Sequence, residues 1–318
     1  MKHIHINFNI RELLMRPAKT EPLAFLRIAT AIVALAELLL LSSHWKDIYG
    51  SHGYIEWVIS SNLFSMPNLP TMAGISELLN REVVSNDMIM YSLLGLYIVS
   101  LSLMMLGFKS NIMAFFSWLL HLTINNSANM YGYGVETFIH VSLFYLIFMP
   151  SSSHWAISKH PETTTTKIYA NLLLTILQIH LCIVYLNAGI AKIEGDDWTS
   201  GEAIWRAVAQ PSYSQVNMFW IAYMPWLSFI ATYLVLLLET AYPLFIWFRL
   251  SRIYWLTGII LMHAGIGIFM GLYAFSAIMT VLNISAFGWS YIENVAKYAR
   301  GRFAWSGKNK LAFKEYIH

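Results

Sequence analysis

The segment from Ile168 to Trp198 reads IYANLLLTILQIHLCIVYLNAGIAKIEGDDW and decides the fold class. Its first part, 168–191, is predominantly apolar and long enough for a helix to cross the hydrocarbon core of a bilayer. The run ends at Lys192, and acidic residues follow at once in 194–197. A lysine at the edge of a hydrocarbon layer is either an ordinary interfacial anchor or an unusual acid–base group.

Composition extends this interpretation to the whole chain. Its 318 residues are 57% hydrophobic and 12% charged, whereas a soluble domain carries about 25% charged residues. Because the apolar residues form long blocks, we predict an all-α, polytopic integral membrane bundle. Eight transmembrane helices are expected, at 22–41, 88–107, 111–127, 135–150, 168–191, 227–248, 253–271 and 273–290. The net charge of +3 comes from loops and tails, which indicates an orientation signal and no nucleic-acid partner.

Basic residues sort to one side of the predicted spans. Of the 20 Lys and Arg, Arg27 lies inside a span, fifteen lie in segments on the side of the termini and four lie on the other side. The positive-inside rule therefore predicts that both termini are cytoplasmic and that Lys192 is extracytoplasmic. Residues 1–21 are expected to form an amphipathic cytoplasmic segment, and 291–318 a basic tail against anionic headgroups. An interfacial or re-entrant helix is expected at 216–225.

Ionisable residues inside spans are costly and therefore informative. Arg27 and Glu37 share the first span but lie about 15 Å apart along its axis, so each needs a partner elsewhere. Glu239 lies in the sixth span, and His263 precedes small residues that permit close helix approach. Each charged residue has a structural alternative, a pair that holds helices together. His121, His140 and His180 are expected to be hydrogen-bonded packing groups, and no metal site is predicted because the spacing of metal-binding histidines is absent.

Lys192 also has a structural explanation. The helix end favours a cation, and Glu194, Asp196 or Asp197 is close enough in sequence to pair with it. Thr199-Ser-Gly-Glu202 resembles a capping box that begins a short helix, which Pro211 would stop. A lysine that acts as a general base must be neutral, and these neighbours favour the charged form.

Several segments, in the same order, resemble the vitamin K-dependent gamma-carboxylase family and the related horizontally transferred transmembrane (HTTM) domain proteins. The lysine segment 188–198 carries most of the resemblance, which covers about residues 20–290. Further similar segments are Phe25-Leu-Arg27 with Glu37, Asp47–Gly53, Asn125-Asn126, Glu239 with Pro243, and His263 with the Met-Gly-Leu segment at 270–272.

The resemblance implies a quinol-dependent carboxylase or epoxidase, a lyase-like membrane enzyme acting on an unknown substrate. Lys192 would act as the base toward a reduced, vitamin K-like quinone. The residues implied to bind this cofactor are Asn125, Asn126, His263 and Trp198. The charges implied to be structural or pocket-lining are Arg27, Glu37, Glu239 and Asp197.

Two departures favour a different relative. Ser127 stands where the carboxylases have a histidine, and only a short tail follows residue 290 in place of a large substrate-binding domain. Length and architecture resemble small bacterial members such as the SdpB type, which is needed to mature a secreted peptide toxin. The alternative is therefore a non-catalytic partner of a peptide or small protein in a bacterial inner membrane. An enzyme predicts a lipid-lined pocket that reaches a neutral Lys192, whereas a partner protein predicts an exposed Lys192 paired with Asp196 or Asp197.

Overall fold

A computed structural model describes residues 14–79, 84–211 and 215–298, and this part of the chain is helical without any strand. The longer helices are α2 (Glu21–Leu40), α6 (Asn86–Met105), α7 (Ser110–Ser127), α8 (Val135–Phe148), α9 (Thr164–Ile193), α12 (Pro225–Thr240), α14 (Arg249–Met270) and α15 (Tyr273–Asn283). The short ones are α3 (Trp45–Tyr49), α4 (Trp57–Leu63), α5 (Met72–Leu78), α10 (Asp196–Thr199), α11 (Ala203–Ala209) and α13 (Tyr242–Phe245). The all-α prediction is confirmed for the described residues.

Five helices of the described region are long and apolar enough to cross a membrane: α2, α6, α9, α14 and the continuous helix Tyr273–Tyr298 that includes α15. This makes the chain an integral membrane protein by the length and composition of its helices. The other three predicted spans also fall on helices, but α8 and α12 are apolar helices of only 14 and 16 residues. Helix length and composition therefore support five crossings in the described region, and the eight expected from sequence are not confirmed.

The predicted span 227–248 is interrupted in the structure. Helix α12 ends at Thr240, and the chain restarts as the four-residue α13, with Pro243 in its first turn. Proline lacks a backbone N–H and collides with the preceding turn, so an α-helix cannot run through this position without a break. The interruption places the end of α12 inside the bundle, beside α9.

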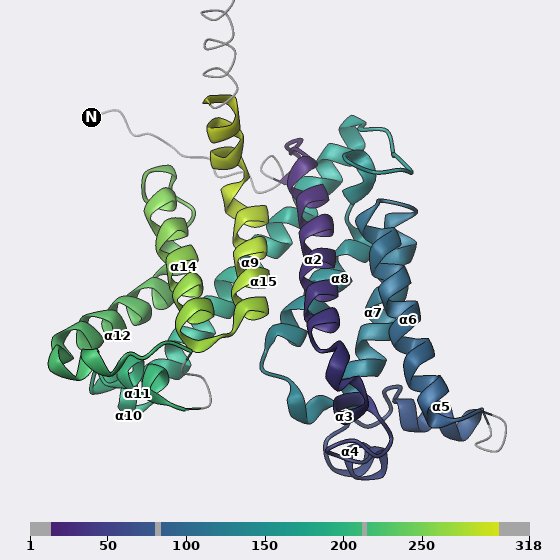
Figure 1. The fold of residues 1–318 in the computed structure, drawn as a ribbon. Helices are drawn as coiled ribbons and strands as arrows, with labels where there is room; N and C mark the ends of the chain where they lie inside the picture. The colour runs from purple at the N-terminus through teal and green to yellow at the C-terminus, as the bar shows by residue number, and fades with distance from the viewer. Residues whose placement is uncertain (1–13, 80–83, 212–214, 299–318) are drawn as a thin grey trace, which may run out of the picture.

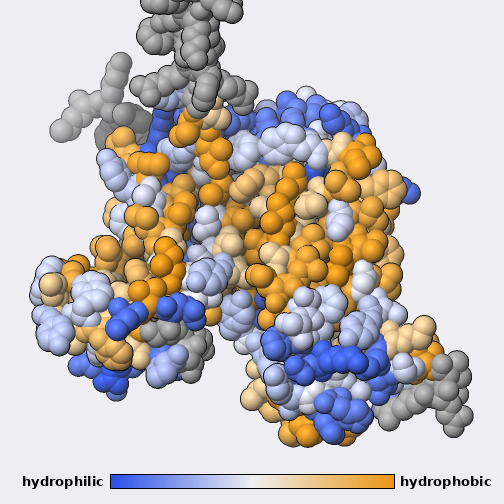
Figure 2. All heavy atoms as spheres, viewed as in Figure 1, coloured by the Kyte–Doolittle hydropathy of each residue, from blue (hydrophilic) through white to orange (hydrophobic). Residues whose placement is uncertain are grey.

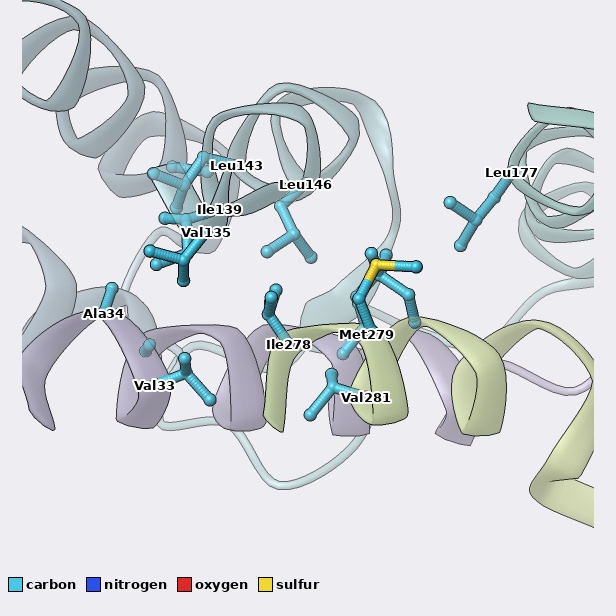
Figure 3. Packing of buried hydrophobic residues seen from close by; sticks show 14 of the residues in the cluster. Val33, Ala34, Val135, Ile139, Leu143, Leu146, Leu177, Ile278, Met279 and Val281 are labelled. Atoms are coloured by element: carbon cyan, nitrogen blue, oxygen red, sulfur yellow. The ribbon is translucent and has the colours of Figure 1, made fainter. Parts of the chain in front are cut away.

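The helices form one bundle in which α15 is central (Figure 1). Helices α2, α6, α7 and α8 pack together on one side, and α9, α12 and α14 on the other, while α15 contacts α14, α2 and α8. Figure 3 shows Leu146 of α8 and Leu177 of α9 pointing toward Met279 of α15, and all three side chains are buried. The apolar core is therefore continuous through the bundle.

The surface of the bundle has an apolar middle. Figure 2 shows orange side chains over the sides of the helices and blue side chains gathered toward both ends. Large apolar residues that remain exposed on these helices include Ile32, Leu96, Ile183, Leu237 and Leu261. A soluble monomer rarely exposes so continuous an apolar surface, and the lipid bilayer is the solvent that suits it.

The first and last described helices are joined at one end of the bundle, which we call the terminal end. Lys19 forms an ion pair with Glu293, at 2.5 Å between Nζ and Oε2, and Figure 1 shows α2 beginning and the α15 helix ending on this side. The two ends of the described chain therefore lie together. Most of the predicted amphipathic segment 1–21 and of the tail 291–318 lies outside the described residues.

Arg27 fixes the structure near the terminal end. Its side chain is fully buried, and its guanidinium donates to the carbonyl oxygens of Ser151 and Trp155 at 2.6 and 2.5 Å. The loop that contains Ser151 and Trp155 also packs against Gly107. The φ of Gly107 is +75°, and a Cβ there would collide with Ala156, so the position has no room for a side chain. Arg27 and Glu37 do not pair, in agreement with their separation along α2. Arg27 therefore ties α2 to the loop that contains Ser151 and Trp155.

Candidate functional site

Lys192 lies in the last turn of α9, at the opposite end of the bundle, and binds a carboxylate from another helix. Its Nζ is 2.6 Å from Oε2 of Glu239, the penultimate residue of α12. The side chain of Lys192 is 25% exposed and that of Glu239 only 7%. The indole ring of Trp198, on α10, has its centroid 5.3 Å from the same Nζ. A cation held between a carboxylate and an aromatic face is stabilised in its charged form.

A close contact between α9 and α12 positions this pair. A Cβ placed on Gly189 would lie 2.6 Å from the Cγ2 of Thr240 and 2.9 Å from its backbone nitrogen. Only glycine permits the two helices to approach this closely. Lys192 is three residues after Gly189 and therefore shares its helix face, while Glu239 precedes Thr240. The sequence motif around Gly189 thus places the lysine on the carboxylate.

The acidic residues that follow Lys192 in sequence have other partners. Asp197 pairs with Arg206, at 3.2 Å between Oδ1 and Nη1. Arg206 also donates to Glu202, and this hydrogen bond, with the attraction of Asp197, raises the pKa of Arg206. The partner-protein alternative predicted an exposed Lys192 paired with Asp196 or Asp197, and this prediction was wrong: the lysine is only a quarter exposed, and it pairs with Glu239, 47 residues away in sequence.

The predicted capping box also differs from the structure. Thr199 ends α10, and Glu202 directly precedes α11, so the two residues flank a turn and do not begin one helix together. The reason is Gly201, whose φ of +82° reverses the chain between the two short helices. Helix α11 ends at Ala209, before Pro211, as expected.

His263 belongs to a buried chain of polar side chains behind the lysine. Its Nε2 lies 2.9 Å from the hydroxyl of Tyr185, which accepts a hydrogen bond from Asn283 at 2.7 Å, and Tyr242 donates to Asn283 at 2.8 Å. Tyr185 comes from α9, Tyr242 from α13, and the other two from α14 and α15. The chain ties four helices together. Sequence reasoning missed Tyr185, Tyr242 and Asn283, because single tyrosines and asparagines in apolar runs give no distinctive spacing.

A separate cavity of about 190 Å³ opens among α2, α3, α7 and α8. Its polar lining includes two carboxylates, Glu37 and Glu136, together with His121 and Asn125, which are hydrogen-bonded to each other. The remaining polar lining is Asn129 with four tyrosines, Tyr49, Tyr97, Tyr131 and Tyr133. Two of the predicted site residues, Glu37 and Asn125, therefore meet in one place.

Asn126 points to different surroundings from its neighbour. Its side chain is buried, accepts a hydrogen bond from the backbone nitrogen of Met66 at 2.7 Å, and donates toward the carbonyl oxygens of Leu69 and Pro70. These contacts hold the loop between α4 and α5. The two neighbouring amides therefore have different contacts: Asn125 lines the cavity, and Asn126 binds the loop between α4 and α5.

The residues implied to bind a quinone are not gathered at the cavity that Glu37 and Glu136 line. Asn125 lines the cavity of α2 and α7, but Asn126, Lys192, Trp198 and His263 do not. Phe275 of α15 stands between the two regions, since its ring packs against Phe138 of α8 on one side and His263 on the other.

Similarity to known proteins is limited. A stretch of 122 residues is 27% identical to the Sporulation-delaying protein SdpB of Bacillus subtilis (strain 168). The matched stretch covers 37% of this chain and 38% of that protein. No protein-family profile matches the chain, and no solved structure matches it. The chain is thus loosely similar to SdpB over well under half the length of either protein.

Proposed function

We propose that this protein is a non-catalytic membrane partner in the maturation or export of a secreted peptide, of the SdpB type. The observation that carries the proposal is the ion pair between Lys192 and Glu239. Through this pair Lys192 joins α9 to α12. Lys192 is not among the residues that line the polar cavity among α2, α3, α7 and α8. The partial similarity to SdpB supports the same class of protein.

The charge state of Lys192 is central to this choice. A lysine base must lose its proton, whereas Lys192 has the geometry of an ion pair, with a carboxylate 2.6 Å from its Nζ and an aromatic ring 5.3 Å from it. Removing either partner would leave the other charge in a poorly solvated place, so the pair acts as a structural clasp. In the proposed orientation, with both termini in the cytoplasm, the clasp and the cavity face the extracytoplasmic side of a bacterial membrane, where a secreted peptide would be met.

A quinol-dependent enzyme with Lys192 as its base is the second candidate. One observation favours it: Glu239 is buried, and transfer of the lysine proton to a buried carboxylate would leave both groups neutral, as a base requires. This candidate predicts that Lys192 is indispensable. The structural proposal predicts that the pair is replaceable by apolar residues of similar size.

The two candidates can be separated in the source organism. The peptides secreted by cells that carry the wild-type chain, a deletion, or Lys192→Met/Glu239→Leu are compared by mass spectrometry. We expect the deletion to leave at least one secreted peptide unprocessed or retained, and the double variant to restore it. Failure of the double variant, despite normal membrane abundance, would favour a catalytic lysine, and an unchanged set of peptides in the deletion strain would refute the partner role.

A second measurement addresses the enzyme directly. Purified protein in lipid nanodiscs is supplied with a reduced naphthoquinone, and oxygen uptake is compared between the wild type and Lys192→Met. Our proposal predicts the same background rate for both proteins. Uptake that depends on the wild-type lysine would replace the partner role by the enzymatic one.

A further inference from the structure

The cavity among α2, α3, α7 and α8 holds two carboxyl groups, those of Glu37 and Glu136, and no lysine or arginine side chain that could pair with them. Its volume of about 190 Å³ is far more than one water requires, about 15 Å³ on the same measure. The cavity is therefore large enough for a small organic group.

The two carboxylates are not equivalent. Glu136 is in the first turn of α8, where its Oε2 accepts a hydrogen bond from the backbone nitrogen of Tyr133 at 3.1 Å. A helix N-terminus stabilises a negative charge there. Glu37 lies in the last turn of the apolar helix α2, where its backbone oxygen accepts a hydrogen bond from Leu41, but within the described residues its side-chain carboxylate has neither a hydrogen bond nor an ion pair. A carboxylate at the end of an apolar helix and without a partner is stabilised by a proton or by a cation from outside the protein.

Tyr97 supplies a second and independent sign of a missing partner. It lines the cavity from α6, its side chain is 4% exposed, and its buried hydroxyl has no hydrogen-bond partner in the described part of the chain. Buried hydroxyl groups are nearly always hydrogen-bonded. Its ring lies 5.7 Å from that of His121, whose nitrogens are already turned toward Asn125. Tyr97 thus brings to the cavity lining a hydroxyl that lacks the hydrogen-bond partner a bound group could supply.

These groups select a ligand by chemistry. An ammonium has one positive charge and three N–H donors, and it matches a carboxylate, a phenol oxygen and surrounding aromatic faces. A tightly held metal ion is less suited, because the ligand atoms of Glu37, Glu136 and His121 do not lie within 4.8 Å of one another. In the described residues that spacing is found for Glu21, His154 and Glu162 near the terminal end.

We propose that this cavity binds a primary ammonium group, with Glu37 as its counter-ion and Tyr97 as a hydrogen-bond acceptor. The inference deepens the proposed function, on which it rests for the source of the amine: the N-terminus or a lysine side chain of the secreted peptide. Binding of a small amine to the purified protein tests the cavity alone, so a failure of the peptide-maturation role would be seen separately.

The test uses full-length protein in lipid nanodiscs and n-butylammonium as the probe. Saturation-transfer NMR measures its affinity against that of the uncharged 1-butanol. We expect saturable binding of the amine only, weakened at least about tenfold in Glu37→Gln and less in Tyr97→Phe, because the charge contributes more than one hydrogen bond. Glu56→Gln is the matched control, since Glu56 is an exposed carboxylate outside the cavity, and it should bind as the wild type does.

Two outcomes would overturn the inference. One is equal affinity for butanol and butylammonium, and the other is unchanged amine binding in Glu37→Gln that remains monodisperse with the wild-type melting temperature. If amine binding is confirmed, a peptide with a free N-terminus and no lysine is compared with an N-acetylated peptide that contains one lysine. The peptide that competes with butylammonium identifies the source of the ammonium group.

Discussion

Glu239 and Glu37 are carboxylates in similar places with different surroundings. Each lies in the last turn of an apolar helix, α12 or α2, at the end of the bundle opposite the terminal end. Glu239 is neutralised by Lys192 at 2.6 Å, whereas Glu37 faces a cavity without a cation among its lining residues. The partner of an intramembrane charge, and not its position on a helix, therefore distinguishes a structural clasp from a binding site.

The largest expected effect comes from breaking the clasp. Glu239→Leu leaves Lys192 without its carboxylate, and we expect the free energy of unfolding to fall by about 3 kcal/mol, as for other buried pairs that lose one member. Unfolding in mixed micelles, followed by tryptophan fluorescence, measures this change. Lys192→Met/Glu239→Leu should recover most of the loss, since two apolar residues replace the pair. No recovery would indicate that the residues do more than bind each other.

Arg27 differs from both glutamates, because backbone carbonyl groups alone bind its charge. Arg27→Met removes the donors to Ser151 and Trp155 and leaves their oxygens unsatisfied, at an expected cost of about 2 kcal/mol. The same unfolding assay measures this cost. Arg16→Met, near the N-terminal edge of the described chain, serves as a control that should have no comparable effect. A near-zero cost for Arg27→Met would mean that water replaces the guanidinium.

Gly189 tests how the clasp is positioned. Gly189→Val would push its side chain against the backbone of Thr240, and we expect a loss of about 1–2 kcal/mol from this overpacking. Gly95→Val, where a Cβ meets no neighbouring atom within 4 Å, is the matched control for a β-branched residue in a helix. If both variants lose the same stability, the close approach of α9 and α12 is not required.

The smallest effect is expected at the cavity. Glu37→Gln removes a charge that has no partner in the described structure, so we expect the stability of the ligand-free protein to stay within about 0.5 kcal/mol of the wild type or to rise. A melting-temperature comparison in nanodiscs is sufficient. A loss as large as that of Glu239→Leu would show that Glu37 has a structural partner, as Glu239 does.

Much of the helical framework follows from the sequence, because long apolar runs are direct evidence for helices in lipid. The eight predicted segments all coincide with helices, and the separation of Arg27 from Glu37 follows from helix geometry. The break at Ala241 was missed, although Pro243 marks it. The partners of the charged residues were the hardest part. Glu239 is distant from Lys192 in sequence, and no spacing rule indicates that α12 would meet the end of α9.

The cavity illustrates the same limit. Glu37 and Asn125 were each noticed in the sequence, but they come from α2 and α7, and only the packing of these helices brings them together with Glu136 of α8. Tyr97 gave no signal in the sequence, because a tyrosine in a membrane helix is common near the interface. Its unsatisfied hydroxyl is visible only once the neighbouring side chains are in place.

A double-mutant cycle on Lys192 and Glu239 tests the central claim most directly. The unfolding free energies of the wild type, Lys192→Met, Glu239→Leu and the double variant give the coupling between the two side chains. We predict a coupling of about 2 kcal/mol or more, with a double variant close to the wild type, and no coupling in the parallel cycle of Lys192→Met with Glu37→Gln. Additive losses for Lys192 and Glu239 would contradict the clasp and return Lys192 to the list of candidate catalytic groups.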